Sequence, residues 1–167
     1  MNDLSYIQPV KMYDLIQKIS TNPDCHVMPK LNHHSDLKLP KDLLEFYRYC
    51  NGVELFIHSK YTYKIVGIDE ITRTDLNIFG ELMNEGSSVH WYNIAHDNNG
   101  DFLSIDLSKD NFGRCYDSFY ETYGLIGDMP MIAQSFGELL LRLFESQGKY
   151  LYWQKEDWQP YYFLDNL

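Results

Sequence analysis

The sequence predicts a single α+β domain in which a mainly antiparallel sheet is flanked by N-terminal and C-terminal helices. Two observations point to this fold class. Apolar residues recur at helical spacing near both ends of the chain, whereas β-branched and aromatic runs separated by turn residues occupy its middle. The length of 167 residues suits one domain better than two, so we expect one unit over residues 1–167.

Two helices are predicted in the first third of the chain. The first begins near Pro9, because proline suits the first helical turn, and it ends at Asn22-Pro23. The second begins at Pro40 and ends at Asn51-Gly52, where left-handed backbone is tolerated. Helical spacing places on the buried faces Met12, Leu15, Ile16 and Ile19 in the first helix, and Leu39, Leu43, Phe46, Tyr47 and Cys50 in the second.

Strands are predicted in five runs rich in β-branched and aromatic residues: Val53–His58, Tyr61–Ile68, Trp91–His96, Phe102–Leu107 and Arg114–Phe119. Asn99-Gly100 predicts a tight hairpin turn between the third and fourth runs, because both residues accept a positive φ. Alternation in the fourth run directs two sets of side chains to opposite faces. Leu103, Ile105 and Leu107 are expected to face the core, and Phe102, Ser104 and Asp106 to face away from it.

Two further helices are predicted downstream of residue 70. A short helix over Leu76–Met83, with Asp75 near its start, follows from Leu76, Phe79, Leu82 and Met83. The last helix begins with the capping box Ser135-x-x-Glu138 and ends at Gly148. Its apolar face is expected to hold Phe136, Leu139, Leu140, Leu143 and Phe144.

The charge of the chain is strongly negative and unevenly distributed. The formal net charge is −10, with +1 in residues 1–67 and −11 in residues 68–167. An anionic surface repels phosphate backbones and acidic membranes, so we expect no direct nucleic-acid or membrane binding, whereas a basic protein would be attracted. The alternative is that the charge only keeps the protein soluble. Neither a membrane-spanning run nor a signal peptide is recognisable, which predicts a cytoplasmic location.

Motifs for catalysis and cofactor binding are missing from the sequence. Cys25, Cys50 and Cys115 are too widely spaced for a zinc knuckle or disulfide framework, and the six histidines form no HExxH motif. The chain has no GxGxxG or GxxxxGK[ST] loop, and Asp97–Asp101 departs from the calcium-loop pattern because its glycine stands fourth. We therefore predict no catalytic, cofactor or metal site and a protein that is not an enzyme.

The segment 150–163 is unusually aromatic, since seven of its fourteen residues are Tyr, Trp or Phe. Two interpretations follow. The segment folds back to cover an edge or a face of the sheet, or it presents aromatic anchors to a partner protein.

Three motifs occur in order over about residues 37–145. The first is Leu39-Pro40 with Phe46 and a closing Asn51-Gly52. The second is Ile94-Ala95-x-Asp97-x-x-Gly100-Asp101, followed by Leu103 and Ile105-Asp106-Leu107. The third is Ala133-x-Ser135-Phe136-x-Glu138-Leu139-Leu140. In this order the motifs resemble the SUKH superfamily, whose best-known branch is the Smi–Knr cell-wall-regulator-like domain. The resemblance implies one domain of that fold.

The resemblance also implies a function, because bacterial members of the superfamily act largely as immunity proteins that neutralise toxin domains, often nucleases. The expected partner is therefore the cognate, basic nuclease domain of a polymorphic toxin, bound by a monomer or a weak homodimer. Turn and strand positions expected to be exposed supply the candidate contacts: Asp97, Asp101, Asp106, Asp110, Asp117 and Glu121, with Trp153 and Trp158 as aromatic anchors. Two alternatives stay open, a non-catalytic regulatory scaffold and an enzyme with a convergent His/Asp site.

Overall fold

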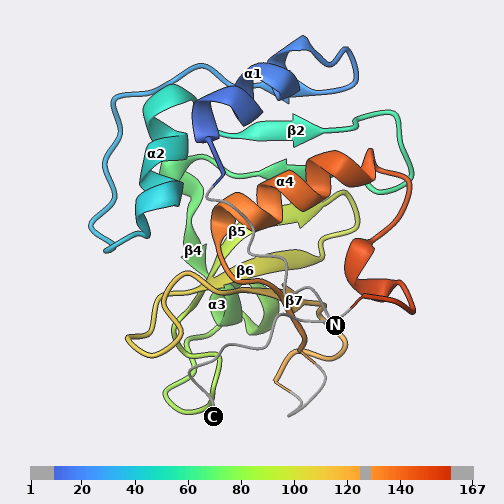
Figure 1. The fold of residues 1–167 in the computed structure, drawn as a ribbon. Helices are drawn as coiled ribbons and strands as arrows, with labels where there is room; N and C mark the ends of the chain where they lie inside the picture. The colour runs from blue at the N-terminus through green and yellow to red at the C-terminus, as the bar shows by residue number, and fades with distance from the viewer. Residues whose placement is uncertain (1–9, 125–128, 159–167) are drawn as a thin grey trace, which may run out of the picture.

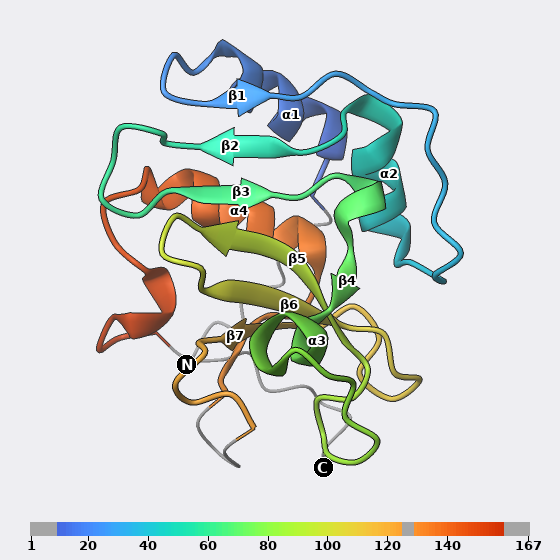
Figure 2. The ribbon, with the colours of Figure 1, turned by 180° about the vertical axis from the view of Figure 1, so that it is seen from behind.

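An eight-stranded antiparallel sheet forms the centre of the fold, with helices α1, α2 and α4 on one face and α3 on the other (Figures 1 and 2). The computed structural model describes residues 10–124 and 129–158. The helices are α1 (Met12–Thr21), α2 (Lys41–Tyr49), α3 (Thr74–Phe79) and α4 (Phe136–Ser146), with two 3-10 helices, η1 (Ile68–Glu70) and η2 (Tyr152–Gln154). The predicted α+β class is confirmed.

The strands run in the order β1-β2-β3-β5-β6-β7-β8, and β4 pairs with β5 outside this path. Their bounds are β1 His26–Val27, β2 Val53–Leu55, β3 Tyr63–Ile65, β4 Thr72–Arg73, β5 Trp91–Asp97, β6 Phe102–Asp106, β7 Cys115–Ser118 and β8 Met131–Ala133. Every pair is antiparallel. The strands predicted at Val53–His58 and Tyr61–Ile68 are therefore present but shorter, because each run bends into a turn or into η1.

The first two helices have the apolar faces that their spacing predicts. All nine residues assigned to those faces are buried. The helix α1 begins at Met12, later than predicted, and Pro9 lies outside the described residues. The ring of Phe46 in α2 meets the ring of Phe136 in α4 edge-on, with centroids 5.0 Å apart. This contact joins the two helices over the sheet.

Asn51-Gly52 has a different role from the predicted left-handed cap. The helix α2 already ends at Tyr49, and Cys50 is extended. Gly52 has φ +116°, and a Cβ there would lie 2.6 Å from the carbonyl oxygen of Ile65, so only glycine fits beside β3. The amide oxygen of Asn51 accepts a hydrogen bond of 3.0 Å from the Ile68 backbone N–H. The pair therefore joins α2 to the sheet.

The predicted hairpin is confirmed as β5 and β6, but its turn is built differently. Gly100 has φ +86°, whereas Asn99 does not adopt a positive φ. The Asp97 carboxylate instead closes the turn, because Oδ1 accepts backbone N–H bonds from Asn99 at 2.8 Å and from Asp101 at 2.9 Å. An aspartate side chain that binds nearby amides stabilises such loops.

The second face of the sheet is buried as well, which the alternating pattern did not predict. Ser104 and Asp106 face away from the main core but are 0% and 2% exposed. The Ser104 hydroxyl lies 2.6 Å from the hydroxyls of both Thr74 and Ser118. Asp106 accepts a hydrogen bond of 3.1 Å from Trp91 Nε1. The side chains of Ser104 and Asp106 are thus both hydrogen-bonded although they are buried.

The short helix α3 is displaced from its predicted range and orientation. It spans Thr74–Phe79 and ends at Gly80, which has φ +76°. The apolar residues that suggested the helix are exposed: Leu76, Phe79, Leu82 and Met83. Its buried residues are Thr74 and Asp75 instead. The Asp75 carboxylate holds the segment by accepting backbone N–H bonds of 2.8 Å from both Leu76 and Met83.

The last helix, α4, has the predicted N-terminal cap with one changed partner. Ser135 Oγ accepts from the Glu138 backbone N–H at 3.2 Å, whereas Glu138 Oε2 accepts from the Gln134 N–H at 2.8 Å in place of the expected Ser135 N–H. The helix stops at Ser146, two residues before the predicted end at Gly148, and both Gln147 and Gly148 have a positive φ.

The described part of the aromatic segment, residues 150–158, covers the sheet. Tyr152 and Trp153 in η2 are 6% and 7% exposed. The Tyr152 hydroxyl donates to the Ile132 carbonyl of β8 at 2.5 Å. Covering the sheet is therefore confirmed for η2, and the remaining aromatics Tyr161, Tyr162 and Phe163 lie outside the described residues.

Candidate functional site

A cavity with a volume of about 810 Å³ lies between the β5–β6 turn, β7 and η2. Figure 2 shows η2, in red, beside that turn. Carboxylates and aromatic rings share its lining: Asp97, Asp101, Asp117, Tyr61, Tyr63, Phe119 and Trp153. We call this cavity the acidic cleft.

Strand register explains why side chains distant in sequence meet in the acidic cleft. Tyr63 of β3 is paired with Asp97 of β5, and Asp117 of β7 is paired with Leu103 of β6. Directly paired residues of antiparallel strands point to the same face, here the face that α4 covers. After α4 the chain returns to this face of the sheet, where Trp153 of η2 contacts Tyr63 and Asp117.

One hydrogen bond connects the floor of the cleft to η2. Trp153 Nε1 donates to Asp117 Oδ2 at 2.9 Å. The Trp153 ring also meets the Tyr63 ring edge-on, with centroids 6.3 Å apart. Asp117 therefore has a structural partner, and Trp153 is held in place against it.

Burial and mutual repulsion perturb the carboxyl groups of the cleft. Burial raises the pKa of Asp117 to about 6, with further increases from the charges of Asp101 and Asp97, although hydrogen bonds from Trp153 and the Phe119 backbone oppose the shift. Burial and the charges of Asp97 and Glu121 also raise the pKa of Asp101. None of the salt bridges between described residues includes a carboxylate of the cleft. Three carboxylates therefore line the cleft, and the ammonium of Lys60, which also lines it, forms none of these salt bridges with them.

Replacing Asp117 with asparagine is expected to flatten the pH dependence of stability. The unfolded group has an ordinary pKa of 3.8 and the folded one about 6, so between these values the folded state binds more protons. The free energy of unfolding of the wild type should then fall as the pH rises through this range. Asp117→Asn should lose this slope and gain about 1–3 kcal/mol at pH 7.

Urea unfolding at pH 4 and pH 7 tests this expectation, with Asp110→Asn as the matched control because Asp110 is exposed. The control should keep the wild-type slope. An unchanged slope in Asp117→Asn would show that another group causes the pH dependence.

The structure distributes the predicted contact residues over several places. Asp97, Asp101, Asp117 and Trp153 meet in the acidic cleft. Glu121 is exposed and near enough to raise the pKa of Asp101. Asp110 is exposed but does not line the cleft, and Trp158 packs against Tyr152 on the other side of η2. Asp106 is buried, so the prediction that its side chain is exposed is wrong.

Sequence reasoning missed the aromatic residues from β3 and β7. Tyr63 is the first residue of β3, Tyr61 stands two residues before it, and Phe119 directly follows β7. Their alternation was a usable signal, because Tyr61 and Tyr63 share one face of an extended chain.

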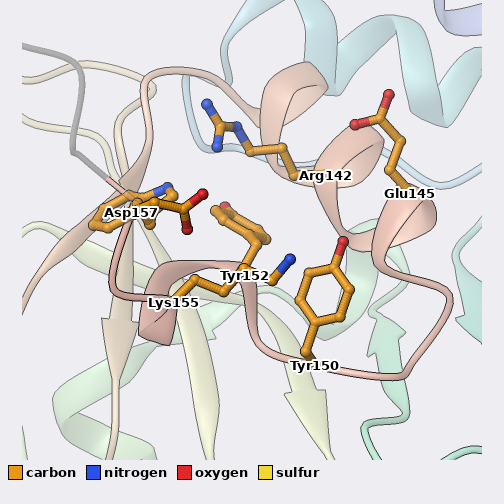
Figure 3. A pocket seen from close by; sticks show the side chains of 7 residues that line it. Arg142, Glu145, Tyr150, Tyr152, Lys155 and Asp157 are labelled. Atoms are coloured by element: carbon orange, nitrogen blue, oxygen red, sulfur yellow. The ribbon is translucent and has the colours of Figure 1, made fainter.

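A second, smaller cavity of about 360 Å³ lies between α4 and residues 150–158. Figure 3 shows Arg142 of α4 across from Tyr152 and Asp157, and Glu145, Tyr150 and Lys155 also line the cavity. Arg142 pairs with Glu138 at 2.8 Å, and the ammonium of Lys155 lies 3.7 Å from the Tyr150 ring centroid. Both signs of charge are present, so this cavity favours neither cations nor anions.

The described residues lack two features, a metal-binding cluster and a membrane-spanning helix. In residues 10–124 and 129–158, no group of three or more His, Cys, Asp or Glu side chains is arranged to hold a metal ion. Across the same residues, no helix has both the length and the apolar composition needed to cross a membrane.

Comparison with known proteins places the chain among relatives. Residues 31–142, which include all three carboxylates of the cleft, match the SMI1 / KNR4 family (SUKH-1). The chain is 38% identical over 149 residues to Immunity protein YokJ of Bacillus subtilis (strain 168), an alignment that covers 86% of this chain and 89% of the relative. No solved structure matches the chain. The family match and the long alignment agree with the predicted resemblance, and the chain belongs to the SMI1 / KNR4 family (SUKH-1).

Proposed function

We propose that this chain is an immunity protein, a single domain acting in the cytoplasm that binds and neutralises a cognate toxin without catalysing a reaction. The observation that carries the proposal is the 38% identity, over 86% of the chain, to a protein named Immunity protein YokJ. The toxin is proposed to be a basic nuclease domain, bound by one copy of the chain or by a weak homodimer.

Electrostatics support a basic partner. Residues 68–167 have a net charge of −11, and most of the acidic cleft lies within them. A nuclease needs a cationic surface to hold its phosphate substrate, and an anionic inhibitor that covers this surface is attracted to it. Complementary fields raise association rates by about 10-fold to 1000-fold at low salt.

The proposed contact surface is centred on the acidic cleft. Asp97, Asp101 and Asp117 contribute negative charge there, with the Trp153 ring in the wall. Glu121 and Asp110 are exposed and remain proposed contacts outside it. Asp106 is withdrawn because it is buried.

Capture of the partner tests this function. Tagged protein is incubated with lysate from the source strain, eluted with a salt gradient, and the eluted proteins are identified by mass spectrometry. Each captured protein is then expressed in a host with and without this chain. We expect one basic protein that stops growth when expressed alone and is tolerated when co-expressed.

The regulatory scaffold is the alternative that the same experiment separates. Capture of several unrelated proteins, none of them toxic, would contradict immunity and favour a scaffold. Toxicity that persists during co-expression of a captured toxin would also contradict neutralisation.

A further inference from the structure

We propose that the acidic cleft receives a single arginine side chain from the partner protein. The choice of a protein toxin as the donor of this arginine rests on the function proposed above. Three features of the cleft support an arginine ligand: its charge, its aromatic walls and its size.

The charge of the cleft fits one cation. Three carboxylates line it, and the salt bridges between described residues neutralise none of them. Lys60 also lines the cleft, but it is exposed and its ammonium lies 5.0 Å from the Tyr61 ring centroid. Burial raises the pKa of both Asp101 and Asp117, and the charge of Asp97 raises each further, so a cation between the two carboxylates would offset this repulsion.

The walls of the cleft favour a guanidinium over an ammonium. Tyr61, Tyr63 and Phe119 offer aromatic surface beside the carboxylates. A guanidinium is planar, stacks on aromatic rings, donates in a fork to carboxylates and is more weakly hydrated than an ammonium. Leu151 and Pro130 supply apolar lining for the aliphatic part of an arginine side chain. A volume of about 810 Å³ holds such a side chain together with water.

The hydrogen bond from Trp153 to Asp117 provides a direct readout. Trp153 Nε1 lies 2.9 Å from Asp117 Oδ2, which accepts its hydrogen bond. A cation that approaches Asp117 therefore changes the environment of the Trp153 indole N–H. The chain has three tryptophans, so the indole region of a ¹⁵N–¹H spectrum contains three signals. Trp153→Phe assigns one of them, and those of Trp91 and Trp158 serve as internal references.

The experiment titrates the full-length protein with N-acetyl-arginine methylamide. The neutral citrulline analogue, almost identical in shape, and the lysine analogue are titrated in parallel. We expect a saturable shift of the Trp153 indole signal with arginine, a weaker affinity for lysine and no saturable shift with citrulline. Asp101→Asn and Asp117→Asn should each weaken arginine binding about threefold or more. The control Asp36→Asn should leave it unchanged, because Asp36 is exposed and does not line the cleft.

Equal shifts with arginine and citrulline, or no shift with either, would overturn the proposal. Equal affinity for lysine would overturn the choice of arginine. These titrations need no toxin, so their failure is distinct from a failure of the capture experiment. If Asp117→Asn alters folding, Asp101→Asn still tests the proposal. The indole N–H of Trp153 donates to Asp117, whereas Asp101 accepts from the Tyr120 backbone N–H.

Discussion

Replacing Asp75 with alanine is expected to destabilise the protein by about 3–5 kcal/mol, because it removes one partner of a buried ion pair. The Asp75 side chain is 1% exposed and pairs with the guanidinium of Arg73 through both carboxylate oxygens. It also accepts the backbone N–H groups of Leu76 and Met83. The variant would leave the two backbone amides without this acceptor, and the Arg73 guanidinium would keep its bond of 2.7 Å to the Met83 carbonyl but lose its carboxylate partner.

Urea unfolding at neutral pH measures this effect, with Asp110→Ala as the matched control at an exposed aspartate. The control should change the free energy of unfolding by less than about 0.5 kcal/mol. The double variant that also replaces Arg73 should be less destabilised than the sum of the single variants. A loss below about 1 kcal/mol in Asp75→Ala would contradict the expected role of this carboxylate.

Replacing Phe46 with alanine should cost about 3–5 kcal/mol, because it opens a cavity where α2 and α4 meet above the sheet. Phe46 is 0% exposed, and its ring contacts those of Tyr47 and Phe136 edge-on at 5.2 and 5.0 Å. Leu44→Ala on the same helix is the matched control, since Leu44 is 43% exposed. Thermal and urea unfolding should show a large loss for Phe46→Ala and a small one for Leu44→Ala. Similar losses in the two variants would contradict the assignment of Phe46 to the core.

The helical parts of the fold were predictable because their signal is local. Spacing of 3.6 residues identified the buried faces of α1, α2 and α4 before any tertiary information was used. The same spacing gave the wrong orientation for α3, since a helix of six residues is positioned by contacts such as that of Thr74 with Ser104 of β6 more than by its own apolar face. Ser104 and Asp106 were misjudged because alternation separates two faces without telling which of them is buried.

The acidic cleft was only partly predictable. The carboxylates Asp97 and Asp101 lie close in sequence at the β5–β6 turn, and Asp117 lies on β7. Local sequence patterns were therefore enough to predict them as contact residues. Their meeting with Tyr63 and Trp153 depends on β3 pairing with β5 and on the return of η2 to the sheet. Both are long-range contacts that leave no periodic signal in the sequence.

The two ends of the strand order limit how this protein can assemble. The edge strand β1 has two residues and the opposite edge strand β8 has three, and the Tyr152 hydroxyl already occupies the Ile132 carbonyl of β8. Edge strands this short offer another chain few backbone N–H and C=O groups for strand pairing. Fibrous polymerisation through these edges is therefore disfavoured, even for a highly expressed protein. For the same reason, partner recognition by strand addition is a poor match for this sheet, and side-chain recognition is the better one.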